Sequence, residues 1–193
     1  LTSCENLFEN CTSLEKAIIN GTFSKLTTIK EMFKNCDNVT SILFNSEGDS
    51  NVKITGTFPK LQSMNGAFRD CDKLSTATLQ IPGTVTELNN LFKSSKLTSA
   101  NVSNVGNVTT MESMFSACSN LTDVSLTGDF SNVETTREMF NNATNISNIT
   151  LSGVSDTDTA NFSNLVNVNQ MFNKWPASKD DVLVDFMGQI IVD

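Results

Sequence analysis

The sequence predicts an α/β solenoid, a right-handed stack of about seven coils, each with one short strand and one short helix, with a parallel sheet on one face. Two observations lead to this prediction. Phe recurs at regular places along the chain, and a helical and an extended apolar period alternate around each of these Phe residues. One such coil cannot bury its own apolar side, so neighbouring coils must share a continuous core.

The recurring Phe residues, here called the anchor Phe residues, mark the coils. An aliphatic residue lies seven positions before each of them, and Leu or Met directly precedes all but one, where Ala67 stands instead. We therefore assign residues 1–175 to the solenoid, with coils starting near 1, 26, 61, 85, 108, 133 and 165, and residues 176–193 to a C-terminal capping or closing segment. The anchors are Phe8, Phe33, Phe68, Phe92, Phe115, Phe140 and Phe172.

The residues around each anchor predict the helix. Apolar residues fall seven, four and one positions before the anchor and three after it, and these offsets share one face of a helix of about two to three turns. Thr86 and Thr109 are candidate caps near the helix start. Thr136 interrupts the apolar series.

The residues after each anchor predict the strand. Leu121, Val124 and Leu126 form an L-x-x-V-x-L run that recurs in most coils. Apolar residues two apart in a β-branched, Thr-rich setting are typical of a short strand. Extra residues in the second and sixth coils fall at 45–51 and 155–161, where we predict loops.

Composition argues against several classes of protein. The chain has no His, which removes the commonest general base and metal ligand, and we expect neither an enzyme nor a cofactor. Its net charge is −8 and Lys and Arg form no stripe, so nucleic acid is not an expected partner. No stretch is apolar enough for direct membrane insertion. Leu1 begins in the middle of a repeat, so we expect a fragment of a longer chain.

Cysteines and acidic residues are the candidates for chemistry. Four cysteines stand three residues after an anchor Phe, where the other coils have Ser95, Ala143 or Trp175, and the occurrence of Cys, Ser and Ala indicates a position for a small buried side chain. We favour a ladder of reduced thiols, with a disulfide between coils or a metal site as the alternatives. The acidic inserts are weak candidates for Ca²⁺, with solvated turns preferred. The residues concerned are Cys11, Cys36, Cys71 and Cys118 in the ladder, and Glu47, Asp49, Asp156 and Asp158 in the inserts.

The outward positions of the predicted strands form the candidate binding face. They are small hydroxyl and amide side chains that lose little entropy on binding and can both donate and accept hydrogen bonds. In the first two coils this face becomes more apolar, with Ile18 and Leu43 predicted to point outward. The candidates are Thr40, Ser41, Leu43, Ser75, Thr76, Thr78, Thr98, Ser99, Asn101, Thr122, Asp123, Ser125, Ser147, Asn148 and Thr150.

The unit V-T-x-M-x-x-M-F-x-x-C-x-x-L-T-x-V-x-L, at Val108–Leu126, resembles the BspA-like leucine-rich repeats of bacterial surface proteins, and is most similar to the mycoplasma and low-GC gut bacterial lipoprotein subgroup. The resemblance covers residues 1–175. It implies a leucine-rich-repeat-like fold at the cell surface or outside the cell, with adhesion as the usual role and no catalytic motif. The inserts, Ala67, Thr136 and Trp175-Pro176 depart from the family pattern.

We therefore expect a cell-surface protein-interaction or adhesion module whose partner is a protein or a glycan. The alternative is a structural protein that self-associates into a filament or layer.

Overall fold

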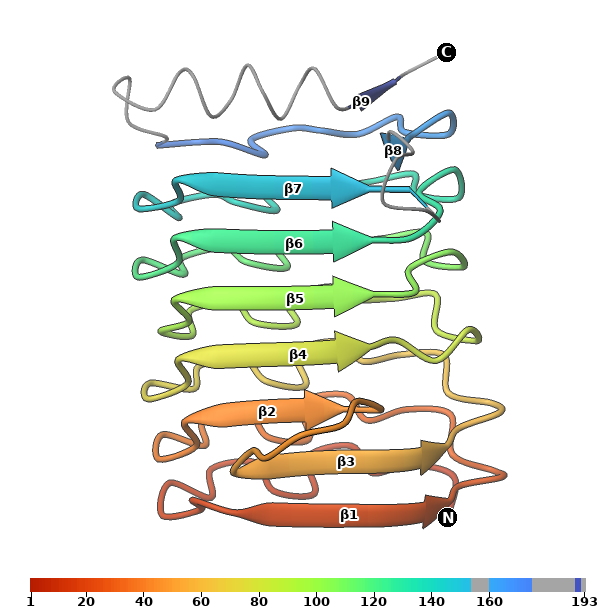
Figure 1. The fold of residues 1–193 in the computed structure, drawn as a ribbon, viewed down its shortest axis with the longest axis vertical. Helices are drawn as coiled ribbons and strands as arrows, with labels where there is room; N and C mark the ends of the chain where they lie inside the picture. The colour runs from red at the N-terminus through yellow and green to blue at the C-terminus, as the bar shows by residue number, and fades with distance from the viewer. Residues whose placement is uncertain (154–159, 175–189, 192–193) are drawn as a thin grey trace.

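The computed structural model describes residues 1–153, 160–174 and 190–191, and its main element is a seven-stranded parallel sheet (Figure 1). The strands lie in the order β1-β3-β2-β4-β5-β6-β7, and two further short strands, β8 and β9, pair with each other. The predicted parallel sheet is confirmed, whereas the predicted closing segment lies outside the described residues except for β9. The strands are β1 (Ala17–Thr22), β2 (Ser41–Phe44), β3 (Val52–Thr57), β4 (Thr76–Gln80), β5 (Ser99–Ser103), β6 (Asp123–Thr127), β7 (Asn148–Ser152), β8 (Ala160–Asn161) and β9 (Ile190–Ile191).

The strands pair in the register that the repeat predicts. Each repeat, with its strand and its anchor Phe, forms one layer of the structure, and equivalent residues of successive layers lie side by side. Apolar and polar side chains alternate, so each strand has one face in the core and one outside. Two inward rows result, one of Ala77, Ala100, Val124 and Ile149 and the other of Leu79, Val102, Leu126 and Leu151.

The prediction of a helix around each anchor Phe is wrong. The described residues contain no α-helix, and the anchor segments are runs of tight turns. In the third layer the N–H of Ala67 donates to the carbonyl of Met64, three residues back rather than four, at 3.1 Å. The N–H of the next residue, Phe68, donates to Leu91 of the following layer at 3.0 Å. Hydrogen bonds within a turn therefore alternate with hydrogen bonds between layers.

Backbone geometry explains why no helix forms. The residues two before and two after each anchor have φ between 50° and 62°, whereas a right-handed helix requires negative φ throughout. A row of three-residue turns brings apolar residues to one side at spacings of three and four, as a helix does, so the sequence period could not separate the two. The positive-φ pairs are Asn6 and Asn10, Glu31 and Asn35, Gly66 and Asp70, Asn90 and Ser94, Ser113 and Ala117, Glu138 and Asn142, and Gln170 and Lys174.

The anchor Phe residues stack on one another through the middle of the molecule. Their ring centroids are 5.1 to 5.8 Å apart from one layer to the next, and Phe33, Phe68, Phe92, Phe115 and Phe140 are fully buried. Offset stacking at this spacing adds to the energy gained from burying apolar area. The side of the molecule that carries the anchor turns is here called the turn side. On it, single parallel bridges join the layers through Ser3, Thr28, Ser63, Glu87, Thr110, Thr135 and Asn167.

The insert of the second layer is more than the predicted loop. After residues 45–51 the chain enters β3, which pairs with β1 on one side and β2 on the other. The seven strands therefore come from six layers, and the prediction of one strand per coil fails at this layer. The alternation Val52-Lys53-Ile54-Thr55 is a strand signal that could have identified β3.

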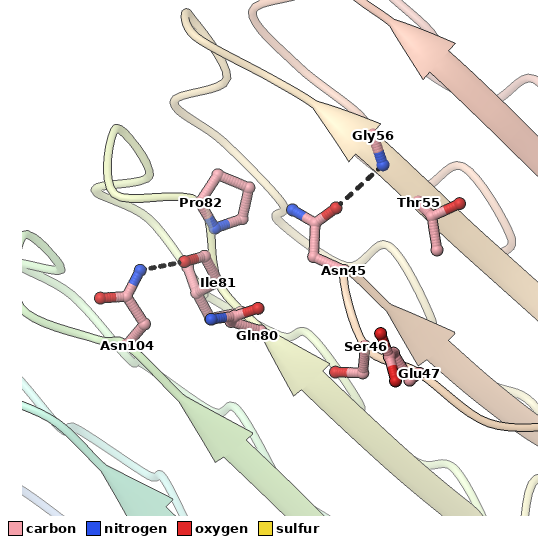
Figure 2. Close-up of a pocket in the computed structure, with 9 residues that line it drawn as sticks. All are labelled: Asn45, Ser46, Glu47, Thr55, Gly56, Gln80, Ile81, Pro82 and Asn104. Atoms are coloured by element: carbon pink, nitrogen blue, oxygen red, sulfur yellow. Dashed lines mark hydrogen bonds between the residues drawn. The ribbon is translucent and has the colours of Figure 1, made fainter.

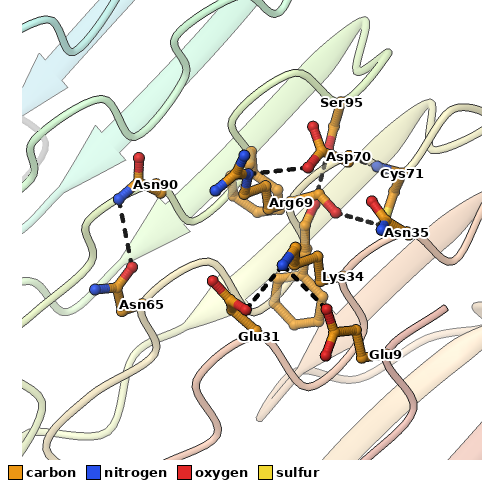
Figure 3. A network of polar contacts seen from close by, with 12 residues as sticks. Glu9, Glu31, Lys34, Asn35, Asn65, Arg69, Asp70, Cys71, Asn90 and Ser95 are labelled. Carbon is orange, nitrogen blue, oxygen red and sulfur yellow. Dashed lines mark hydrogen bonds and ion pairs between the residues drawn. The ribbon is translucent and has the colours of Figure 1, made fainter. Parts of the chain in front are cut away.

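Polar side chains on the turn side also connect the layers (Figure 3). Lys34 Nζ lies 3.0 Å from Glu9 Oε1 of the preceding layer and 3.0 Å from Glu31 Oε2 of its own. Asn90 Nδ2 donates to Asn65 Oδ1 at 3.4 Å. These contacts fix the register between neighbouring layers. Because the ion pairs are partly exposed, they add little to the free energy of unfolding.

The unusual positions of the repeat are buried in the inner layers. Ala67 and Thr136 are both almost completely shielded from solvent, and the Thr136 hydroxyl lies 3.3 Å from the sulfur of Met171. Core positions in the two end layers are more open. Leu7 and Val168, both predicted to be core, are 55% and 52% exposed.

Candidate functional site on the outer sheet face

The outer face of β4–β7 carries three rows of small polar side chains. Two of the rows consist of predicted face residues, and the structure brings them together as neighbours: Thr76, Ser99, Asp123 and Asn148 in one row, and Thr78, Asn101, Ser125 and Thr150 in the other. Sequence reasoning missed the third row, although the strand alternation continues one step further to Gln80, Ser103, Thr127 and Ser152.

The first two rows line a shallow groove of about 390 Å³ that crosses the four strands. Neighbouring strands are about 4.8 Å apart, so the groove extends for roughly 14 Å from β4 to β7. An extended peptide advances about 3.3 Å per residue, and about four or five residues would span it.

A line of hydroxyls at the start of the strands is already used within the fold. Thr98 Oγ1 donates to the carbonyl of Ser75 at 2.9 Å, and Thr122 Oγ1 donates to the carbonyl of Thr98 at 2.9 Å. Ser75 and Ser147 make the same bond to the carbonyls of Thr40 and Thr122. These predicted face residues therefore join layers, and their donor hydrogens are not directed at solvent.

The insert of the second layer folds back over the outer face of β2. Ser50 Oγ donates to Ser41 Oγ at 2.9 Å, the N–H of Asn51 donates to the same oxygen at 3.2 Å, and Asn51 Nδ2 donates to Thr40 Oγ1 at 2.6 Å. Lys53 Nζ, on the neighbouring strand β3, donates to the Gly48 carbonyl at 3.1 Å. This segment therefore occupies the outward hydroxyls of β2.

The same cover corrects the prediction that Leu43 faces solvent. Leu43 is only 6% exposed because the insert lies directly above it. The closeness is shown at Gly48, where an added Cβ would be 3.6 Å from Leu43 Cδ1. Ile18 on β1 is 60% exposed, as predicted. It lines a second pocket, of about 570 Å³, together with Lys16 and Lys53.

The two weak Ca²⁺ candidates of this insert line different pockets. Glu47 lines a pocket of about 430 Å³ where β2 ends, with Asn45, Gln80 and Asn104 (Figure 2). Asp49 lines the separate pocket beside β1. Asp156 and Asp158 lie outside the described residues. In the part of the chain that the structure describes, no three His, Cys, Asp or Glu side chains are grouped to hold a metal ion.

Asp123 is the charged residue of the groove. Its Oδ1 accepts a hydrogen bond from Asn148 Nδ2 at 2.6 Å, and its Oδ2 lies 2.6 Å from Thr122 Oγ1, whose one hydrogen is shared with the Thr98 carbonyl. These two donors, Thr122 first, lower the pKa of the Asp123 carboxyl because they stabilise its ionised form. The carboxylate is exposed, and no Lys or Arg of the described residues pairs with it.

The five cysteines are free thiols, and three of them connect layers through hydrogen bonds. The thiols of Cys36, Cys71 and Cys118 donate to the carbonyl of the preceding layer's anchor Phe, at 3.2, 3.3 and 3.0 Å. Ser95 takes the same position and donates to Phe68 at 2.7 Å. Burial raises the pKa of the Cys36 and Cys118 thiols to about 12 and raises that of Cys71 as well, so these groups are poor nucleophiles.

The match to a protein family follows the repeat. A family model described as "Mycoplasma protein of unknown function, DUF285" matches residues 2–81 and again residues 62–185. The chain belongs to this family. Residues 62–81 fall within both matches to the DUF285 model, as expected where one repeat can align with more than one position of a model. No curated protein and no solved structure matches the chain.

The described part of this DUF285 chain has no helix long and apolar enough to cross a membrane. Its outer face offers hydrogen-bond donors and acceptors in a repeating grid, with one oriented carboxylate. Such a surface is suited to recognising a polar ligand.

Proposed function

We propose that this DUF285 chain is a cell-surface binding module whose groove over β4–β7 takes an extended polypeptide. We also assign its architecture to a right-handed leucine-rich-repeat-like solenoid of the BspA-like kind, with turns in place of helices. The layered parallel pairing and the stacked anchors support this assignment, and connections between parallel strands are right-handed in nearly all proteins. The proposed surface role rests on the resemblance of the repeat to the BspA-like repeats of bacterial surface proteins.

The observation that carries the binding proposal is the docked insert. Residues 48–51 run back over β2, and Ser50 and Asn51 hydrogen-bond to the hydroxyls of Ser41 on β2 and of Thr40 just before it. A polypeptide segment thus already lies on one strand of this face. At the positions equivalent to Ser41, β4 and β5 present the hydroxyls of Thr76 and Ser99, which a ligand can contact in the same way.

The physical properties of the groove support a peptide as the ligand. Thr78, Asn101 and Ser125 lie next to one another in its middle row, and they lose little side-chain entropy when they become ordered. Each can also donate and accept, which matches the alternating N–H and C=O groups of an extended backbone.

A displayed library of random heptapeptides tests this proposal. We expect the folded protein to retain a subset of peptides, and Ser125→Tyr to abolish their retention because the ring fills the middle of the groove. The matched control is Ser13→Tyr, the same substitution at an exposed turn residue outside the groove. Retention that survives Ser125→Tyr, or binding to a glycan array with no peptide retained, would contradict a peptide groove.

Self-association is a second candidate, favoured by the edge of the sheet. Among the strands that the structure describes, β1 has a partner on only one side, and Ile18 on this strand and Leu7 in the same layer are both exposed. Unpaired edges with apolar side chains promote pairing with another chain. Sedimentation velocity over a hundredfold concentration range should then show assembly that Ile18→Lys removes. A monomer at every concentration would refute this candidate.

A further inference from the structure

We propose that the peptide bound in the groove carries a Lys or Arg side chain that pairs with Asp123. This inference rests on the proposed peptide groove and adds the chemistry of the ligand. It concerns one position of the ligand, the residue that lies above β6.

The charge pattern of the groove is the first support. Its lining residues are Ser, Thr, Asn, Ala and Val apart from Asp123, and the third row beside it is uncharged too. A groove with one carboxylate among neutral groups favours a cation at that point and disfavours an acid there. Discrimination of this kind sets specificity more than total affinity.

The orientation of the carboxylate is the second support. Asn148 Nδ2 holds one oxygen at 2.6 Å, and the Thr122 hydroxyl, whose one hydrogen is shared with the Thr98 carbonyl, lies 2.6 Å from the other, so the group is oriented before any ligand arrives. A carboxylate offers about four acceptor sites, and these two bonds leave about half of them for a ligand. An arginine or an ammonium group can therefore bind without first ordering the Asp123 side chain.

The surroundings of Asp123 are the third support. In the described residues the ion pairs lie among Glu5, Glu9, Lys30, Lys34 and their neighbours, or around Arg69 and Arg137, and none includes Asp123. The carboxylate is exposed at the groove instead of being paired within the fold. Its charge is available to a ligand.

The heptapeptide library tests the inference when the retained peptides are sequenced for the wild type, Asp123→Asn and the control Glu134→Gln. Glu134→Gln removes the same charge at an exposed residue beside the turn-side bridges, away from the groove. We expect Lys and Arg to be enriched among peptides retained by the wild type and by Glu134→Gln. With Asp123→Asn we expect retention without that enrichment.

Single peptides give the size of the effect. For a retained peptide, replacing its basic residue by Gln should weaken binding about two- to fivefold to the wild type, the range of an exposed ion pair, and leave binding to Asp123→Asn unchanged. Retained peptides without basic enrichment, or enrichment that persists in Asp123→Asn, would overturn the inference and leave the peptide groove standing. Failure to retain any peptide would overturn both.

Discussion

At the residue scale, the structure depends on small polar groups that satisfy backbone atoms between layers. Ser95 is fully buried, and its hydroxyl donates to the carbonyl of Phe68 at 2.7 Å and accepts the N–H of Cys71 at 3.2 Å. In other layers a thiol at this position makes the carbonyl contact. The sequence predicted the requirement for a small side chain, but not that the side chain must also donate a hydrogen bond.

Ser95→Ala should therefore be more harmful than its size suggests. It leaves a buried carbonyl and a buried N–H without a partner, and we expect the free energy of unfolding to fall by about 1–3 kcal/mol in urea titrations. Ser95→Cys keeps a donor of the kind used in three other layers, so we expect a smaller fall in its free energy of unfolding. Equal losses for the two variants would show that the hydrogen bond is unimportant.

The buried thiols predict a loss of stability at high pH. The pKa values of Cys36 and Cys118 are raised from 9.0 to about 12, and that of Cys71 is raised too. Below about pH 9 the folded and the unfolded chain both keep these thiol protons, so the contribution of the thiols to the free energy of unfolding is fully present. Above about pH 9 the unfolded chain releases them first, so the free energy of unfolding falls by about 1 kcal/mol per thiol and pH unit.

Urea titrations at about pH 8 and about pH 10.5 test this prediction. The control is the triple variant Cys36→Ser, Cys71→Ser and Cys118→Ser, in which the hydroxyl donor is kept as at Ser95. Lys30 and Lys34 also have raised pKa values, because Glu5 and Glu9 pair with them, and they add a loss that both proteins share. A triple variant as sensitive to pH as the wild type would contradict the assignment to thiols.

At the scale of elements, the sequence predicted what its periodicity determines. The strands after the anchors and the inward rows follow from apolar residues two apart, because only an extended chain places such residues on one face. The turns were mistaken for helices because the positive φ values occur at residues as different as Glu31, Ser113 and Ala117. The burial of Leu43 could not be foreseen, since it depends on where the insert folds back.

The pairing of the extra strand β3 with β1 can be tested at Gly56. This residue has φ +143° and lies opposite Gly21, and a Cβ on it would be 1.9 Å from the Gly21 carbonyl oxygen. We expect Gly56→Ala to reduce the free energy of unfolding by about 1–3 kcal/mol or more. Gly83→Ala is the matched control, because a Cβ there meets nothing within 4 Å. Similar stabilities of the two variants would argue against this β1–β3 pairing.

At the scale of the whole molecule, each layer contacts mainly its neighbours, and stability is shared along the stack. The two sides of the stack differ. The turn side carries the ion pairs of Lys30, Lys34 and Arg137, whereas the outer face of β4–β7 is neutral except for Asp123. The sequence predicted most residues of this face, but not the groove or the insert that covers its β2 end. Those depend on the register between layers, which a single repeat does not contain.

The most direct test of the binding face is an NMR titration of threonine methyl groups with a peptide retained from the library. Thr76, Thr78 and Thr150 line the groove, whereas Thr28, Thr110 and Thr135 lie on the turn-side bridges. We expect the first three methyl signals to shift as the peptide is added and the last three to stay in place. Shifts confined to the turn side, or spread equally over both sides, would contradict the account.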